Sequence, residues 1–138
     1  MPDWNEWNSA AIAEFRANAG RLGGRFEGAP VLLLTTTGAK SGLPRTNPMM
    51  YLDDADRLVV FASKGGAPED PDWYRNLLAN PEVTVEVGTE TFTAKAVVIT
   101  GTERDRLYAR QAERYPQFAG YQAKAERIIP VVALERLG

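Results

Sequence analysis

Two turns in this sequence combine glycine with basic side chains, a combination that suits the binding of small anions. The first turn spans residues 38–45 and carries Lys40, Ser41 and Arg45 around two glycines. Glycine lets successive backbone N–H groups point in one direction and form an anion site, while Lys, Ser and Arg add charged and hydroxyl donors. A solvated hairpin turn would have the same composition, and the spacing is not that of a phosphate-binding P-loop.

The second turn, Ser63-Lys64-Gly65-Gly66, also follows a predicted strand. Taken alone it is equally consistent with an ordinary turn. Two turns rich in glycine and lysine at strand ends of one small β-protein could, however, converge on a single ligand. The sequence therefore raises the hypothesis of one positively charged site for an anionic ligand.

Aromatic and amide side chains later in the chain could complete such a site. Trp73 and Asn76 follow the second turn and suit a pocket wall with a polar donor. Tyr115, Phe118 and Tyr121 could stack on a flat substrate beside a redox cofactor. A packed helix end would use the same three aromatic residues, so both interpretations stay open.

The residue types that are missing narrow the chemistry further. The chain has no Cys and no His, which excludes thiolate catalysis, metals held by these ligands, and Ser-His-Asp triads. Carboxylates cluster at 53–56 and 69–72, but both clusters fall in predicted turns, where Asp bends or caps the chain. We therefore expect no metal site. A bound cofactor is the simplest source of reactivity, because the protein then supplies only binding, orientation and electrostatics.

Length and charge set the broad class. The 138 residues are typical of one domain, and 44% hydrophobic with 25% charged residues is ordinary for a folded protein. The net charge of −2 argues against general nucleic-acid binding. The acidic N-terminus lacks the apolar core of a secretory signal, and no stretch is apolar enough to span a bilayer. We expect a cytoplasmic protein of one domain, residues 1–138, with residues 1–25 as a helical arm.

Helical spacing of apolar residues predicts a helix over residues 3–18, where Asp3 and Glu6 form a capping-box pattern. Asp70 is expected to cap a second helix, and Thr102 to begin a third. The tryptophan-bearing N-terminal helix could cover a cofactor, a partner subunit or a membrane surface. Packing on the core is the simpler interpretation.

The strand pattern predicts an α+β fold that is mainly β. Tight turns join consecutive strands, which therefore pair antiparallel, and Pro48 favours an edge or a bulge. Half-buried alternation in several strands suggests a barrel that closes on itself, with an N-terminal helix and short flanking helices. The six predicted strands are 31–37, 45–52, 58–62, 83–87, 92–98 and 131–134.

Three separated blocks of the sequence resemble the deazaflavin-dependent nitroreductase family. The blocks are LLLTTTGAKSGLPRTNPM, FASKGGAPEDPDWYRNLLANPEVTVEVG and YPQFAGYQAKAERIIPVVALERL. They occur in the right order, and the likeness runs from about residue 10 to residue 137. The resemblance implies a split β-barrel of the FMN-binding kind. It also implies binding of coenzyme F420, a deazaflavin with a phosphate and an acidic lactyl-oligoglutamate tail.

The resemblance further assigns roles to residues. The implied cofactor-binding residues are Lys40, Ser41, Arg45, Pro48, Met49, Ser63, Lys64, Gly65, Gly66, Trp73 and Asn76. The implied substrate-side residues are Met50, Tyr115, Phe118 and Tyr121. Among these, Tyr121 and Tyr115 are the candidates for a catalytic proton donor, with water as the alternative source of the proton.

The implied activity is hydride transfer from reduced F420 to quinones, activated enones or nitroaromatics. Met50 and Phe118 stand where nitroreducing relatives can carry Tyr, so two hydroxyl donors are missing and quinone or enone reduction is favoured over nitro reduction. An FMN-binding oxidoreductase on the same barrel and a non-catalytic deazaflavin-binding protein are the alternatives. The expected partner is a small redox substrate and not nucleic acid. Homodimer formation and peripheral membrane contact through residues 3–18 are further hypotheses.

Overall fold

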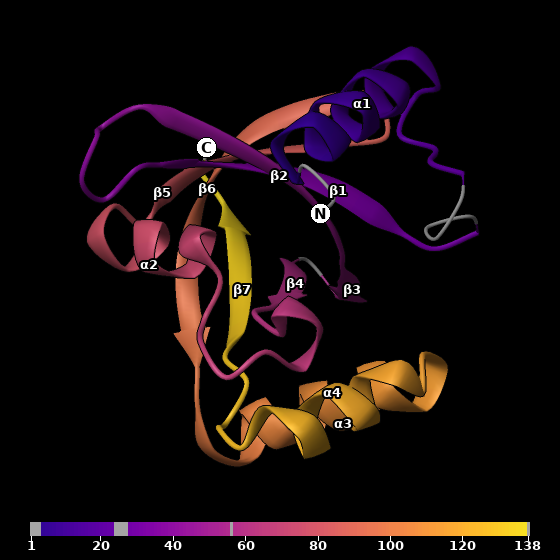
Figure 1. Ribbon diagram of the computed structural model, residues 1–138, viewed down its shortest axis with the longest axis vertical. Coiled ribbons are helices and arrows are strands. Elements are labelled where there is room, and N and C mark those ends of the chain that lie inside the picture. The colour runs from indigo at the N-terminus through magenta and orange to yellow at the C-terminus, as the bar shows by residue number, and fades with distance from the viewer. Residues whose placement is uncertain (1–3, 24–27, 56, 138) are drawn as a thin grey trace.

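The computed structural model describes residues 4–23, 28–55 and 57–137, and the side chains of residues 4–7 and 65 lie outside that description. Within these residues one antiparallel sheet of seven strands forms the centre of the molecule (Figure 1). The strands are β1 (Val31–Thr37), β2 (Pro44–Met50), β3 (Leu52–Asp54), β4 (Arg57–Phe61), β5 (Glu82–Val87), β6 (Glu90–Ile99) and β7 (Val131–Arg136). Their spatial order is β2-β1-β5-β6-β7-β4-β3.

The helical elements lie around this sheet (Figure 1). They are α1 (Trp4–Ala17), the short 3-10 turn η2 (Lys64–Gly66), α2 (Asp72–Ala79), α3 (Gly101–Arg114) and α4 (Gln117–Ala125). In the described parts of the chain, no helix combines the length and the apolar character needed to cross a membrane.

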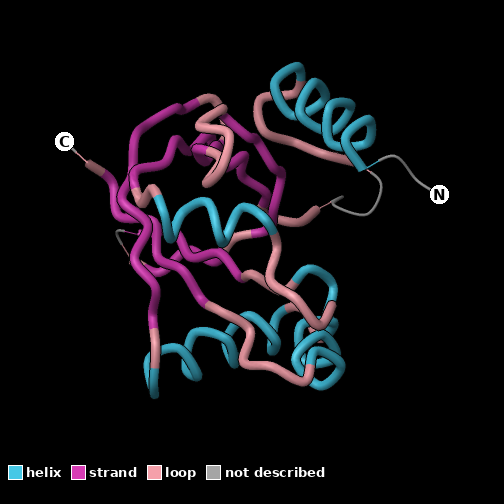
Figure 2. The backbone as a smooth tube through the Cα atoms, turned by 60° about the vertical axis from the view of Figure 1, so that its left-hand side comes forward, coloured by secondary structure: helices cyan, strands magenta, loops and turns pink. Residues whose placement is uncertain are grey.

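The sheet is curled because its two edge strands are neighbours in the sequence. β2 pairs only with β1, and β3 pairs only with β4, so they form the two edges. Only Tyr51 separates them. Consecutive Cα atoms are 3.8 Å apart, so the two edges must approach within about 7 Å at this point. The result is the curled, half-barrel sheet seen in Figure 2.

The predicted antiparallel sheet is confirmed, but the fold is mixed α/β rather than mainly β, and the predicted count of six strands is wrong. The predicted strand 45–52 is divided into β2 and β3 at Tyr51, whose N–H donates to the carbonyl of Pro30 outside the sheet. The sequence shows an unbroken run of strand-forming residues there, because the change from one sheet edge to the other is a long-range event. The edge position predicted for Pro48 is confirmed, and Leu33 of β1 is its register partner.

Helices cover both faces of the sheet. On one face, Leu32 and Leu34 of β1 pack with Trp73 and Leu77 of α2. Alternate strand residues point to the other face, where α1 packs on β1 through Phe15. On that same face α3 and α4 pack against β4 and β7, with Phe118 of α4 in this core. The sheet thus holds α1 and α2 on opposite sides of β1.

Helix starts differ from the predictions in two places. Pro71 occupies the N-cap of α2, so the prediction that Asp70 caps it is wrong. The Asp70 carboxylate instead accepts a hydrogen bond from Arg127 at 2.7 Å, a tertiary partner that local pattern does not reveal. α3 begins at Gly101, before the predicted start at Thr102. The predicted first helix agrees with α1 as far as it is described, while its capping box of Asp3 and Glu6 lies outside the described side chains.

Candidate cofactor-binding cleft

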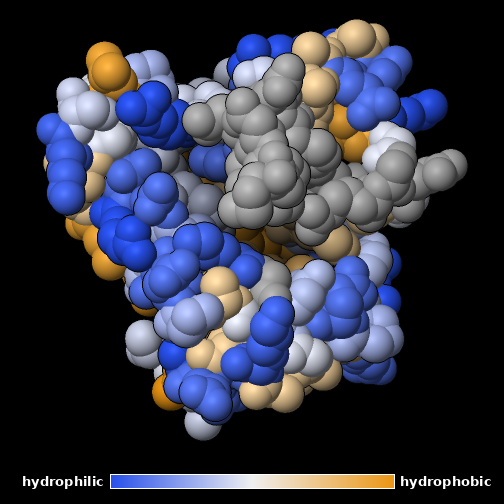
Figure 3. Space-filling model, viewed as in Figure 1, coloured by the Kyte–Doolittle hydropathy of each residue, from blue (hydrophilic) through white to orange (hydrophobic). Residues whose placement is uncertain are grey.

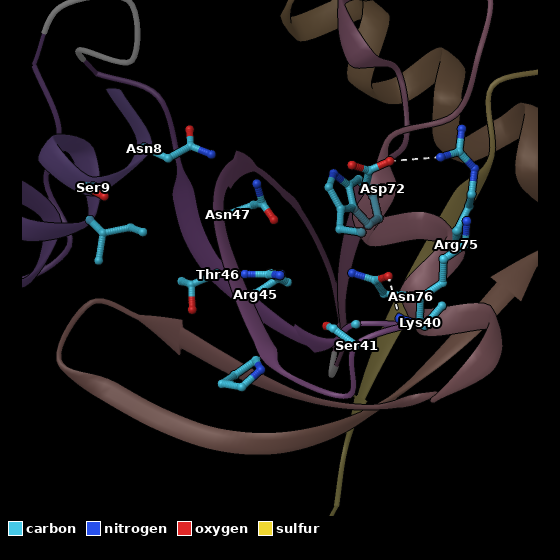
Figure 4. A pocket seen from close by; sticks show the side chains of 15 residues that line it. Asn8, Ser9, Lys40, Ser41, Arg45, Thr46, Asn47, Asp72, Arg75 and Asn76 are labelled. Atoms are coloured by element: carbon cyan, nitrogen blue, oxygen red, sulfur yellow. Dashed lines mark hydrogen bonds and ion pairs between the residues drawn. The ribbon is translucent and has the colours of Figure 1, made fainter. Parts of the chain in front are cut away.

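A cleft of about 1040 Å³ opens between α1, α2 and the turn that joins β1 to β2. Its lining is mostly polar and includes three cationic side chains, one carboxylate and the indole of Trp73. Figure 4 shows the labelled side chains of α1 facing those of β2 and α2 across it. The lining residues are Asn8, Ser9, Ile12, Gly38, Ala39, Lys40, Ser41, Pro44, Arg45, Thr46, Asn47, Asp72, Trp73, Arg75 and Asn76.

Asn76 docks α2 onto the β1–β2 turn and so builds one corner of the cleft. Its amide donates to the Thr36 hydroxyl at 3.1 Å, and its carbonyl oxygen accepts from the Ala39 N–H at 3.0 Å. Both Asn76 and Thr36 are buried. A buried amide that satisfies both of its polar ends holds its partners in a single arrangement. Asn76 therefore positions the turn that carries the predicted anion site.

The turn itself is pinned by its own backbone. Gly38 donates to the carbonyl of Leu43 at 2.8 Å, Gly42 donates to the carbonyl of Gly38 at 2.9 Å, and Leu43 donates to the Ser41 hydroxyl at 3.2 Å. Gly42 has a φ of +70°, a conformation that a residue with a Cβ adopts only with strain. Among the described residues, these bonds and the one from Ala39 leave the N–H groups of Lys40 and Ser41 without a partner.

Two of the three cations in the cleft are available to a ligand. Lys40 and Arg45 are exposed, and neither forms an ion pair with any side chain that the structure describes. The third cation, Arg75, is paired with Asp72 at 2.8 Å. Charge-assisted hydrogen bonds from Lys and Arg, with backbone N–H groups beside them, suit phosphate or carboxylate oxygens. This part of the cleft is therefore suited to an anion.

The second glycine–lysine turn is not among the residues that line this cleft. The Lys64 ammonium pairs with Glu69 at 3.1 Å. A Cβ on Gly66 would lie 3.0 Å from the carbonyl oxygen of Tyr121, so this turn packs closely on α4. Part of the predicted site is thus brought together in the cleft, namely Lys40, Ser41, Arg45, Trp73 and Asn76. The roles predicted for Ser63, Lys64, Gly65 and Gly66 stay predictions.

Arg127 holds this second turn in place. Its guanidinium is mostly buried and pairs with Asp70 while donating to four backbone carbonyls. The accepting carbonyls belong to Ala62, Ser63, Ala67 and Glu69. A planar guanidinium with five donors is the side chain best able to satisfy several loop carbonyls at once. The loop between β4 and α2 is therefore tied to the chain that connects α4 with β7.

The predicted ring-side and substrate-side residues lie in the cores on either face of the sheet. Met49 is buried in the core between the sheet and α2, and Pro48 is half-buried in β2. Met50 packs against the cores under α1 and under α3–α4. None of these three is among the residues that line the cleft. Their predicted contacts with a ring or a substrate stay predictions.

Phe118, Tyr115 and Tyr121 belong to the core between α3, α4 and the sheet. Phe118 is buried, and its ring packs edge-on against Phe61 and Tyr121 at centroid distances of 5.6 and 5.2 Å. The geometry around Phe118 is that of a packed helix end. Tyr115 and Tyr121 are half-buried, and none of the three lines the cleft. A catalytic role for Tyr121 or Tyr115 stays a prediction.

Several lining residues had no sequence signal. Asn8, Ser9 and Ile12 reach the cleft only because α1 packs on the outer face of β1. Thr46 and Asn47 follow Arg45 along β2, and proximity to that residue was the one clue. In the view of Figure 3, hydrophilic side chains predominate, with small apolar areas between them.

Comparison with known proteins identifies the family. The model of the F420H(2)-dependent quinone reductase family matches residues 7–136. The chain belongs to this family. An F420H(2)-dependent quinone reductase of Mycobacterium tuberculosis strain H37Rv is 45% identical over 131 residues, which are 90% of this chain and 86% of the relative. The resemblance found in the three sequence blocks is thereby confirmed.

Solved structures agree with the F420H(2)-dependent quinone reductase assignment. An F420-H2 dependent reductase has a TM-score of 0.71 and 42% identity, covering 77% of this chain and 94% of that chain. A solved domain-swapped dimer has a TM-score of 0.72 and 38% identity, covering 96% of this chain and 98% of that chain. Both therefore share the curled-sheet fold with this member of the family.

The cleft fits the cofactor that the family name implies. F420 carries a phosphate and carboxylates, and the cleft offers Lys40, Arg45 and two backbone N–H groups that have no partner among the described residues. Trp73, only 8% exposed, provides a flat and rigid wall beside them. The donor set matches an anionic ligand with an aromatic part, which is the class to which F420 belongs.

Proposed function

We propose that this protein is an oxidoreductase that uses reduced F420 to reduce quinones or activated enones. The observation that carries the proposal is the cleft in which Lys40 and Arg45, without ion-pair partners among the described side chains, stand beside the buried indole of Trp73. Family membership supports the same cofactor. Reduced F420, when bound, supplies a hydride that an electron-poor acceptor takes up.

The chain's own residues would bind and orient. Arg45 and the Lys40–Ser41 backbone would hold the phosphate, because a charged donor and backbone N–H groups match its oxygens. Trp73 would restrict the cofactor from one side and exclude water there, which strengthens the electrostatic interactions within the cleft. We further propose that Lys64, Ser63 and Pro48 contact the cofactor, as the resemblance implies. No side chain needs to form a covalent bond.

The resemblance puts Met50 and Phe118 on the acceptor side, although neither residue lines the cleft. Met50 and Phe118 offer no donor to charge that develops on a nitro group, and Phe118 is buried in an aromatic core. We therefore propose quinone and enone reduction in preference to nitro reduction. The proton that accompanies the hydride would come from Tyr121, from Tyr115 or from water.

For the fold, we propose that the curled sheet corresponds to the FMN-binding type of split β-barrel, with residues 1–25 as an arm on a single domain. The support is the one-residue link through Tyr51, which joins the two edges of the sheet. β2 and β3 then act as one strand that crosses the seam of the barrel.

The decisive measurement compares F420 and FMN on the same protein. Absorbance spectra and dissociation constants should show tight binding of F420, and the bound reduced form should be oxidised by a menadione-like quinone. Arg45→Ala should weaken F420 binding by about 1.5–3 kcal/mol, the value of a hydrogen bond to a charged group. Arg114→Ala serves as the control, since Arg114 is exposed at the end of α3 and does not line the cleft.

The same measurement separates the alternatives. Preferential binding of FMN would favour an FMN-dependent oxidoreductase on this fold. Binding of F420 without oxidation by any quinone, enone or nitroaromatic would favour a non-catalytic deazaflavin carrier. Unchanged F420 affinity in Arg45→Ala would remove Arg45 from the site.

Two further predictions concern partners. A domain-swapped dimer among the solved relatives supports testing for a homodimer, which sedimentation at several protein concentrations would reveal.

Membrane contact through residues 3–18 has less support, because Phe15 and Ala11 of α1 are buried against the core. Flotation with anionic liposomes, with and without residues 3–18, tests it.

A further inference from the structure

On the α2 side of the cleft, Arg75 already carries a negatively charged partner. The Arg75 guanidinium donates to the Asp72 carboxylate at 2.8 Å and to the backbone carbonyl of Asp70 at 3.0 Å. All three groups belong to the first turn of α2 or to the residues just before it. The guanidinium is therefore held at the rim of the cleft by acceptors from α2 and from the segment just before it.

The position of this ion pair relates it directly to Lys40. The hydrogen bond between Ala39 and Asn76 fixes the turn against α2. Lys40 follows Ala39, and Arg75 precedes Asn76, so the two cations flank the same anchoring bond. In Figure 4 the labelled cations run from Arg45 on β2 through Lys40 to Arg75 on α2. The cleft thus has three cations, and one of them, Arg75, is already paired with a carboxylate of the protein.

We propose that Arg75 binds the acidic tail of the cofactor by exchanging the Asp72 carboxylate for a carboxylate of the tail. This inference rests on the proposed function, because it concerns the oligoglutamate part of F420. In the free protein the Asp72 carboxylate is paired with the Arg75 guanidinium. When a long tail reaches the rim, one of its carboxylates takes the place of Asp72, because both present the same planar pair of oxygens to the guanidinium.

Exposure makes the exchange feasible. The side chain of Arg75 is 53% exposed and that of Asp72 is 89% exposed, so either can move into solvent without opening the core. Ion pairs at such positions are weak and screened by salt. An incoming carboxylate therefore competes with a partner that is easily displaced.

The test uses F420 preparations with short and with long oligoglutamate tails, with FMN as the tail-free ligand. Asp72→Asn should tighten binding of long-tailed F420 about two- to fivefold, the range expected for an exposed ion pair. Arg75→Gln should weaken it by a similar factor and reduce the preference for long tails. Neither variant should change FMN binding. In the Arg75→Gln background, Asp72→Asn should give a much smaller gain.

Glu90→Gln is the matched control. Glu90 pairs with Arg136 on the distant β6–β7 ladder and does not line the cleft, yet the substitution removes the same single negative charge. An equal gain in Glu90→Gln and Asp72→Asn, or an equal gain from Asp72→Asn with and without Arg75, would overturn the exchange. So would unchanged long-tail affinity in Arg75→Gln. Wild-type protein that binds no form of F420 would instead contradict the proposed function, and this inference with it.

Discussion

At the scale of single residues, two glycines in contact with or within α4 have opposite roles. Gly66 has a φ of +85°, and a Cβ there would lie 3.0 Å from the Tyr121 carbonyl and 3.2 Å from the Tyr121 Cα. Gly120 lies within α4, and a Cβ there would meet nothing within 4 Å. The first glycine is required by backbone conformation and close approach, and the second by neither.

We therefore expect opposite effects on stability from the same substitution. Gly66→Ala should lower the free energy of unfolding by at least about 1 kcal/mol, because it strains the backbone and displaces α4. Gly120→Ala should raise it by up to about 1 kcal/mol, because alanine is the better helix former. Denaturant unfolding of both variants measures the difference. Equal losses in the two would show that the close contact of Gly66 is not maintained in solution.

Tyr108 provides a pH-dependent test of the core under α3. Burial raises the pKa of Tyr108 to about 12, and its hydroxyl donates to the carbonyl of Phe118 at 2.5 Å. The unfolded chain loses this proton near pH 10 while the folded chain keeps it. The stabilisation is thus complete below pH 10 and is lost as the pH rises toward about 12.

Tyr108→Phe isolates this contribution. The variant should be less stable than wild type by about 1 kcal/mol at neutral pH, because it leaves the Phe118 carbonyl without its donor. The gap should narrow between about pH 10 and pH 12. Burial also raises the pKa of Tyr51 and Tyr74, but both are retained in the variant, so the difference belongs to Tyr108. Parallel pH profiles would contradict the assignment.

At the scale of elements, α1 is a cleft wall anchored at its far end. Arg16 forms a two-pronged hydrogen bond with Glu86 of β5, at 3.0 and 2.9 Å, and this bond raises the pKa of the Arg16 guanidinium. Phe15 is buried beside it. Asn8 and Ser9 then project from the other half of the helix into the cleft. The Arg16–Glu86 pair therefore influences the cleft only through the position of α1.

Arg16→Gln should loosen α1 without unfolding the sheet. The cost to overall stability should stay below about 1 kcal/mol, because the pair is partly exposed, while amide exchange in α1 should quicken. Cofactor affinity should fall in parallel. The charge-swapped double variant Arg16→Glu with Glu86→Arg should restore both properties. A charge swap that restores neither amide protection in α1 nor cofactor affinity would mean that the Arg16–Glu86 pair does not position α1.

At the scale of the whole molecule, the net charge and the charge of the cleft have opposite signs. The chain carries −2, whereas the cleft is lined by three cations and one carboxylate. The attraction of an anionic cofactor is therefore local. It acts over no more than about 10 Å at 0.1 M salt.

This separation predicts a salt dependence that differs between ligands. Raising the ionic strength should weaken F420 binding more than FMN binding, because the acidic tail adds charges that FMN lacks. Dissociation constants measured across a salt series give both slopes. If Lys64 contacts the tail, Lys64→Ala should make the F420 dissociation constant less dependent on salt than it is in the wild-type protein. Equal slopes for F420 and FMN in the wild-type protein would contradict a role for the tail.

Local sequence pattern predicted several elements and part of the site. The run 31–37 and the Gly88–Thr89 hairpin followed from local pattern and are confirmed as β1 and the β5–β6 connection. Lys40, Arg45 and Trp73 were predicted to share a site, and they line one cleft. Lys64 was grouped with them, but it does not line this cleft, and its role stays a prediction. Both turns combine glycine with lysine and serine, so residue type alone did not show which of them lines the cleft.

The sequence by itself determined the kinds of elements, their order and the need for a borrowed cofactor, because periodicity and the absence of His and Cys are local or compositional properties. Only the tertiary structure decided that Tyr51 joins the two edges of the sheet, that α1 walls the cleft, and that Phe118 lies in a core. These depend on contacts between residues far apart in the chain, such as Asn76 with Ala39 or Arg16 with Glu86. Local pattern carries no record of such pairs, since nothing near either partner in the sequence points to the other until the fold brings them together.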